Sequence, residues 1–124
     1  MGQRRIVAID DNITNLKLLE KLLEEKYTMV CFQDALDALV YVQNNDADLI
    51  LSDLMMPNMT GLQLLQEIHI RNIYIPFIII SAYDNKTYKQ DAYSKGVIKY
   101  IVKPINPEEL FDVVEDSLTL NPKE

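Results

Sequence analysis

Short apolar runs with the length of β-strands recur along the chain at regular intervals. They lie at residues 6–10, 27–32, 48–53, 75–81 and 97–102. The fourth run contains Phe77 and three consecutive isoleucines, a continuous apolar stretch that is typical of a strand buried on both faces. The pattern therefore predicts five strands in a sheet whose middle is covered on both sides.

A segment with helical periodicity follows each predicted strand. In the first segment four leucines fall on one face of a helix: Leu16, Leu19, Leu22 and Leu23. Either Asn12 or Thr14 has a side chain suited to cap that helix. The remaining segments begin near four residues, which are Asp34, Gly61, Asn85 and Asn106. The chain is therefore predicted to contain five helices.

Strands that alternate with helices indicate an α/β fold, in which a parallel sheet is covered on both faces. Right-handed crossovers and two-sided cover favour a doubly wound five-stranded parallel sheet in the flavodoxin-like order 2-1-3-4-5. Nothing along residues 1–124 resembles a repeat, a low-complexity stretch or an internal linker. We therefore expect one domain over residues 1–124.

Composition and charge narrow the functional classes. Hydrophobic residues make up 48% of the 124 residues and charged residues 25%, which is typical of a soluble globular protein. The net charge of −7 argues against direct nucleic-acid binding, because that binding depends on basic side chains. No apolar run approaches the roughly 20 residues that span a membrane, and the N-terminus lacks the apolar core of a secretory signal. We therefore expect a cytoplasmic protein without a membrane partner.

Polar residues stand where the predicted strands end. Asp10 and Asp11 close the first strand and Asp53 closes the third. Ser81 closes the fourth strand, and Lys103 follows the fifth. Taken singly, such residues have ordinary roles, for example as acids at a helix N-terminus or as surface lysines. The carboxyl ends of parallel strands meet at one edge, however, so these side chains should converge where open α/β sheets bind ligands.

Three carboxylates at one edge repel one another, by about 4 kcal/mol per pair at roughly 4 Å and an effective dielectric of about 20. Lys103 can balance one charge, and Mg²⁺ suits the rest because it binds carboxylate and phosphate oxygens. Such a site is suited to phosphoryl transfer, in which a carboxylate can act as the nucleophile and form an aspartyl phosphate. Asp53 is the best candidate phosphoacceptor, because it stands alone between the paired acids and Ser81.

Short motifs with a fixed order extend over nearly the whole chain. They are Asp10-Asp11, Asp53, Met56-Pro57 with Gly61, Ser81-Ala82, Tyr100 and Lys103-Pro104. In this order and spacing they resemble the receiver domain of two-component response regulators. The resemblance implies Mg²⁺ as the cofactor, with Asp11 and Asp53 as direct ligands. It further implies a water-mediated contact from Asp10 and a ligand from the backbone carbonyl of Met55.

The resemblance also assigns roles to the residues around the acids. It implies that the Ser81 hydroxyl and the Lys103 ammonium bind phosphoryl oxygens. Tyr100 matches an aromatic position whose ring turns inward when Ser81 moves toward the phosphate. The Lys103–Pro104 peptide bond is expected to be cis.

The function that the resemblance implies is a phosphorylation-dependent signalling switch rather than an enzyme. Asp53 would accept a phosphoryl group from a histidine kinase or a phosphotransfer protein, and the domain would promote its own phosphorylation and dephosphorylation. The surface of the fourth helix, fifth strand and fifth helix would then contact a second copy or an output domain. Here that surface should carry Tyr88, Tyr93 and Ile98, unless Ile98 packs into the domain's own core.

The sequence departs from the pattern of one subclass of receiver domains. Ile98 and Lys99 stand where two acids usually precede the switch aromatic, and the last helix contains no arginine. Receivers that dimerise for DNA binding usually pair an acid of the fifth strand with an arginine of the fifth helix. The missing pair argues against the winged-helix transcription-factor subclass.

Three alternatives use related chemistry or a related sheet. A haloacid-dehalogenase-like phosphatase places its nucleophile in an Asp-x-Asp-x-Thr motif after the first strand, and residues 10–14 do not supply that motif. A flavodoxin offers hydroxyls and glycine to the phosphate of FMN, which Asp10 and Asp11 would repel. A pseudo-receiver that binds partners without phosphorylation is the third alternative, and the complete set of acids argues against it.

Overall fold

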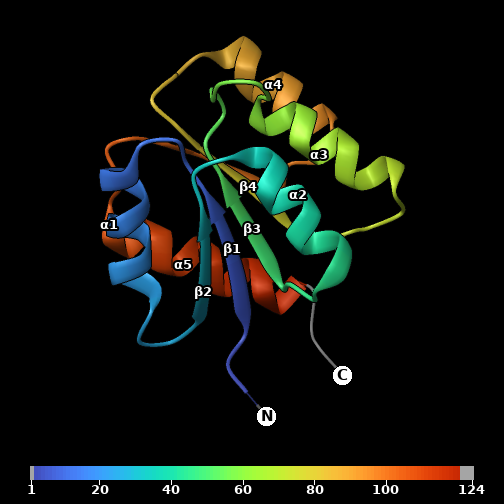
Figure 1. The fold of residues 1–124 in the computed structure, drawn as a ribbon. Coiled ribbons are helices and arrows are strands. Elements are labelled where there is room, and N and C mark those ends of the chain that lie inside the picture. The colour runs from blue at the N-terminus through green and yellow to red at the C-terminus, as the bar shows by residue number, and fades with distance from the viewer. Residues whose placement is uncertain (1, 121–124) are drawn as a thin grey trace.

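The computed structural model describes residues 2–120, in which five strands alternate with five helices (Figure 1). In chain order the elements are β1 (Arg5–Ile9), α1 (Ile13–Leu23), β2 (Thr28–Phe32), α2 (Ala35–Asn44), β3 (Leu49–Ser52), α3 (Gly61–Ile70), β4 (Phe77–Ser81), α4 (Lys86–Ser94), β5 (Lys99–Val102) and α5 (Pro107–Leu120). The strands are parallel and lie in the order β2-β1-β3-β4-β5. The predicted doubly wound, flavodoxin-like sheet is confirmed.

Two layers of helices enclose the sheet. α2, α3 and α4 cover one face, and α1 and α5 cover the other (Figure 1). Along β1 the side chains alternate, so that Val7 and Ile9 pack in the first layer and Ile6 and Ala8 in the second. All four are at most 1% exposed. Because apolar side chains fill both faces, polar groups are left to the edges of the sheet.

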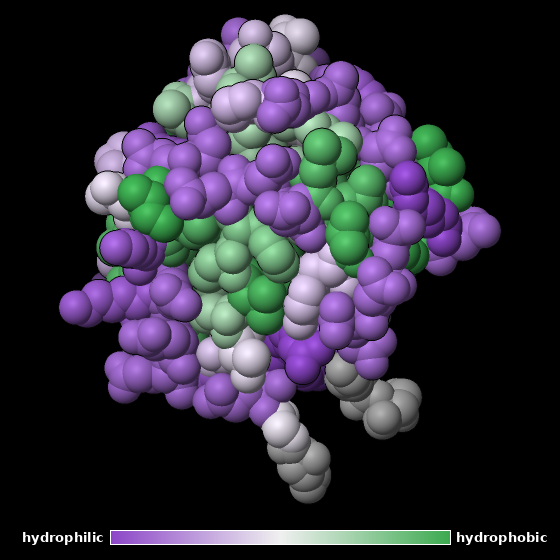
Figure 2. Space-filling model, viewed as in Figure 1, coloured by the Kyte–Doolittle hydropathy of each residue, from purple (hydrophilic) through white to green (hydrophobic). Residues whose placement is uncertain are grey.

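The β2 edge of the sheet is less completely covered. Residues 29–32 are only half-buried, and Figure 2 shows hydrophobic residues reaching the surface there between hydrophilic ones. Burial, with a smaller contribution from the Glu20 carboxylate, raises the pKa of the Cys31 thiol in this strand to about 11. That thiol is therefore protonated and unreactive at neutral pH. No helix within residues 2–120 combines the length and the apolar character needed to cross a membrane.

The helices α1, α2 and α5 begin shortly after the carboxyl ends of β1, β2 and β5, and short polar side chains cap them. Asn12, and not Thr14, caps α1, and its side chain accepts a hydrogen bond from the N–H of Asn15 at 3.1 Å. Asp34 caps α2 in the same way. Asn106 accepts two backbone N–H bonds at the start of α5. The three connections that these residues close are short.

Four of the five strands are shorter than the sequence predicts, and β1 is shifted by one residue toward the N-terminus. Asp10 and Asp53 lie just beyond the ends of β1 and β3, and Ile98 precedes β5. The N–H of Asp53 still donates to the carbonyl of Ile9 at 2.9 Å, so the ladder continues on one side only before the chain turns. Ile98 is 38% exposed, so it does not pack into the core. The acids thus lie one residue past the sheet, on its carboxyl edge.

Gly61 opens α3 at a point where this helix meets the end of β3. A Cβ at Gly61 would collide with the backbone carbonyl of Asp53 and would lie 2.8 Å from Ile79 Cδ1 and 3.2 Å from Ser52 Oγ. The Gly61 N–H also donates to the carbonyl of Leu54 at 2.8 Å. The absence of a side chain therefore lets α3 hold the loop that begins with Asp53.

Replacement of Gly61 by alanine should lower the free energy of unfolding by about 1–3 kcal/mol, because a backbone carbonyl yields less easily than the end of a side chain. Gly2→Ala is the matched control, since no atom lies within 4 Å of the Cβ that it adds. Urea unfolding of the wild type and both variants measures the effect. Equal unfolding midpoints for the two variants would contradict this close packing.

Candidate functional site

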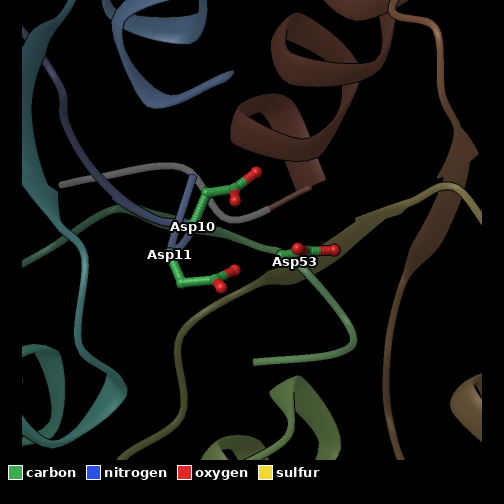
Figure 3. Close-up of side chains that lie close together, drawn as sticks. All are labelled: Asp10, Asp11 and Asp53. Carbon is green, nitrogen blue, oxygen red and sulfur yellow. The ribbon is translucent and has the colours of Figure 1, made fainter. Parts of the chain in front are cut away.

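Three carboxylates gather at the carboxyl edge of the sheet (Figure 3). Asp10 and Asp11 follow β1 and Asp53 follows the neighbouring strand β3. One carboxylate oxygen from each lies within 4.8 Å of those of the other two. Asp10 is buried, Asp53 is half-buried and Asp11 is exposed, so the cluster opens to solvent on the Asp11 side. The predicted convergence of these acids is confirmed in position.

Lys103 reaches the same cluster from the loop after β5. Its Nζ lies 3.0 Å from Oδ2 of Asp10 and 3.7 Å from Oδ2 of Asp53. The N–H of Lys103 donates to the carbonyl of Ser81 at 2.8 Å, which fixes the start of this loop beside β4. The Lys103–Pro104 peptide bond is cis, as expected. One ammonium thus faces two of the three carboxylates.

Backbone groups orient the two acids that face Lys103. Oδ1 of Asp10 accepts the N–H of Asn12 at 2.9 Å, and Oδ1 of Asp53 accepts the N–H of Leu54 at 2.8 Å. Each of these carboxylates therefore has one oxygen held by the main chain and the other turned toward the ammonium.

Burial raises the pKa of the Asp53 carboxyl above its ordinary value. Lys103 opposes this shift, Asp10 adds to it, the Leu54 N–H opposes it, and Asp11 adds to it again. Because the pKa in the folded protein is raised, the stability that protonated Asp53 contributes is lost as the pH rises through that pKa. A positive charge bound beside Asp53 would therefore stabilise its ionised form.

The donor set fits a hard divalent cation. Three carboxylates against one ammonium leave two negative charges uncompensated in the cluster. All three acids offer oxygen, which Mg²⁺ prefers, and no thiolate or imidazole accompanies them in this cluster. Met55 follows in the next loop with its side chain 46% exposed, and the ligand role of its carbonyl stays a prediction.

Ser81 and Tyr100 lie on the neighbouring strands β4 and β5. Ser81 is fully buried, and its Oγ accepts the N–H of Tyr83 at 3.1 Å. The Tyr100 ring is turned inward and is only 6% exposed. Its hydroxyl donates to the backbone carbonyl of Tyr83 at 2.7 Å. The ring thus occupies an inward position, and the role of Tyr100 as a switch stays a prediction.

The sequence did not predict two contacts in this region. One is the Tyr83 carbonyl, which receives the Tyr100 hydroxyl. The other is the Tyr93 hydroxyl on α4, which accepts the backbone N–H of Tyr100 at 3.1 Å. The sequence carries no signal for either, because both depend on how α4 and the loop before it lie against β5.

Comparisons with known proteins agree on one family. A family model described as the response regulator receiver domain matches residues 6–115. The two-component response regulator ARR14 of Arabidopsis thaliana is 35% identical over 112 residues, which is 88% of this chain and 29% of that protein. The transcriptional regulatory protein ZraR of Salmonella typhimurium is 30% identical over 118 residues, which is 94% of this chain and 27% of that protein. The chain thus spans less than a third of the length of these curated relatives.

Solved structures show the same likeness over a whole domain. The receiver domain of the Francisella response regulator 1452 has a TM-score of 0.91 and 27% identity, covering 97% of this chain and 100% of that one. The chemotaxis protein CheY4 of Vibrio cholerae has a TM-score of 0.88 and 25% identity, covering 94% of this chain and 99% of that one. The match favours this family over the phosphatase and flavodoxin alternatives. With three carboxylates and a lysine beyond the carboxyl ends of its strands, the chain belongs to the receiver domain family of two-component response regulators.

Proposed function

We propose that this chain is a phosphorylation-dependent switch that accepts a phosphoryl group on Asp53 from a histidine kinase or a phosphotransfer protein, with Mg²⁺ as cofactor. The observation that carries the proposal is the position of Asp53 among Asp10, Asp11 and Lys103. One Asp53 oxygen is held by the Leu54 N–H and the other faces Lys103, so the carboxylate is oriented for attack.

In the transfer step an Asp53 oxygen forms a bond to phosphorus while the phosphorus–nitrogen bond of the donor phosphohistidine breaks. The electron pair of the broken bond goes to the imidazole nitrogen of the donor. Lys103 offers its ammonium to a phosphoryl oxygen, and the Ser81 hydroxyl binds another. Bound Mg²⁺ supplies further positive charge to the phosphoryl oxygens.

We assign the metal ligands by the exposure and hydrogen bonding of the acids. Both oxygens of Asp10 are engaged, one by the Asn12 N–H and one by Lys103, which suits a contact through water. Asp11 is exposed, and within residues 2–120 its carboxylate has no hydrogen-bond donor, which suits direct ligation. Asp53 and the carbonyl of Met55 complete the proposed set.

Incubation with acetyl phosphate and Mg²⁺ should add one phosphoryl group to the wild type and none to Asp53→Asn, because the amide removes the nucleophile. Intact-mass measurement reads the result directly. Asp48→Asn tests whether loss of a carboxylate alone matters, since Asp48 stands at the opposite end of β3 and should leave labelling intact. Full labelling of Asp53→Asn would refute Asp53 as the phosphoacceptor. An unlabelled wild type would favour the pseudo-receiver alternative.

We also propose that the α4, β5 and α5 surface contacts a second phosphorylated copy. Tyr88 and Tyr93 of α4 are 41% and 45% exposed, and Ile98, which directly precedes β5, is 38% exposed. Lys86 of α4 and the acids of α5 are also exposed, and Lys89 of α4 is partly exposed. An apolar centre with a charged rim is the usual composition of a protein interface.

Ile98→Asp should weaken self-association of the phosphorylated protein while Asp53 is still labelled, because a carboxylate would have to be buried at the centre of the interface. Ile70→Asp places the same charge at the end of α3, on a residue that is 71% exposed, and should leave association unchanged. Sedimentation velocity of the phosphorylated proteins compares the three. Identical monomers for the phosphorylated wild type and Ile98→Asp would rule out the homodimer.

A further inference from the structure

A chain of three hydrogen bonds leads from Ser81 to the outer surface of α4. The Ser81 Oγ accepts the N–H of Tyr83 at 3.1 Å. The carbonyl of Tyr83 accepts the hydroxyl of Tyr100 at 2.7 Å. The N–H of Tyr100 donates to the hydroxyl of Tyr93 at 3.1 Å. The hydroxyl expected to contact the phosphoryl group is thus connected to an exposed residue on a different element.

Tyr100 is held at both ends by the segment that contains α4. Its side-chain hydroxyl is fixed by the loop before this helix, and its backbone N–H is fixed by Tyr93 near the helix end. Between them Lys89 places its Nζ 6.0 Å from the centre of the Tyr100 ring, and the same Nζ pairs with Asp84 at 2.6 Å. The inward position of the ring therefore depends on where α4 lies.

The donor in the hydrogen bond to Tyr93 is the Tyr100 N–H, which no neighbouring strand of the sheet pairs. β5 is the edge strand of the sheet, so only β4 lies beside it. The Tyr100 N–H is instead satisfied by a hydroxyl of a side chain that is 45% exposed. Loss of this hydroxyl leaves the N–H without its acceptor and releases one of the two ends of Tyr100.

We infer that Tyr93 is a positioning residue for the switch: its hydroxyl holds Tyr100 inward and so couples the position of α4 to Ser81. The inference rests on the proposed phosphorylation of Asp53 for its role in signalling. Phosphorylation that requires the inward arrangement is favoured in proportion to the population of that arrangement. The exposed end of the chain at Tyr93 is then a point where a partner bound to α4 changes the reactivity of Asp53.

A simpler role is also consistent with the geometry, in which Tyr93 only seals the N–H of an edge strand. The two roles predict effects at different residues. A seal affects the Tyr100 amide alone, whereas a positioning residue also affects the Tyr83 amide and the rate at which Asp53 is phosphorylated. The experiment therefore needs a readout at each place.

Tyr93→Phe keeps the ring and removes only the accepting hydroxyl. Tyr74→Phe is the matched control, because Tyr74 is 71% exposed in the loop between α3 and β4, and its hydroxyl has no hydrogen bond within residues 2–120. Amide exchange of Tyr100 and Tyr83 is followed by NMR without a phosphodonor. The initial rate of labelling by acetyl phosphate with Mg²⁺ is followed by intact mass.

Tyr93→Phe should speed exchange of both amides and slow labelling, each by about fivefold, while Tyr74→Phe stays within about twofold of the wild type. Faster exchange at Tyr100 alone, with labelling unchanged, would overturn the inference in favour of the seal. Unchanged exchange at both amides would overturn it outright. An unlabelled wild type would instead refute the proposed function, and the Tyr83 amide alone would then support or overturn the positioning role.

Discussion

Asp10, Asp11 and Asp53 bring carboxylate oxygens within 4.8 Å of one another, and their repulsion opposes the packing of the strand ends that carry them. At an effective dielectric of about 20 such a pair costs about 4 kcal/mol at roughly 4 Å, a large fraction of the stability of a small domain. Lys103 offsets part of this cost through its 3.0 Å contact with Asp10. Burial raises the pKa of Asp53, and Lys103, 3.7 Å from it, opposes that shift only in part. The fold around the site therefore holds the three carboxylates together against their mutual repulsion.

Several features of the fold supply the restraint that this repulsion requires. Backbone N–H groups hold one oxygen of Asp10 and one of Asp53, and Gly61 lets α3 close on the loop after β3. The same edge carries Ser81, whose hydroxyl begins the hydrogen-bond chain to Tyr100 and α4. A new charge on Asp53 would thus alter the balance at one end of a connected structure. Its other end lies on the surface that we propose contacts a partner.

The sequence was sufficient for the parts of this arrangement that follow from topology. Asp53 stands at the end of a buried run, and parallel strands bring such ends together, so its meeting with Asp10 was predictable. The approach of Lys103 required the strand order as well, because β3 and β4 separate β5 from β1. The remaining features depend on how the helices and strands pack against one another. Whether Ile98 is in the core or exposed depends on where the chain enters β5.

The bond between Tyr93 and Tyr100 lies furthest from what a sequence can specify. Tyr100 lies seven positions after Tyr93, with the end of α4 and Gly96 between them, and Gly96 adopts a φ of 107°. The contact exists only because this turn returns the chain along α4 at one angle. No residue pattern encodes that angle. Local capping at Asn12, by contrast, left only two candidates and needed the structure merely to choose between them.

Mg²⁺ titration of the unphosphorylated protein, followed by thermal unfolding, tests most directly whether the acid cluster is a metal site. Mg²⁺ should raise the melting temperature of the wild type, because it relieves the repulsion that the folded state contains. Asp11→Ala should weaken the affinity for Mg²⁺ by about tenfold or more, and by more than Asp10→Ala, since the Asp11 carboxylate is exposed while Lys103 engages that of Asp10. Equal affinities for the wild type and Asp11→Ala would contradict a magnesium site built on these acids.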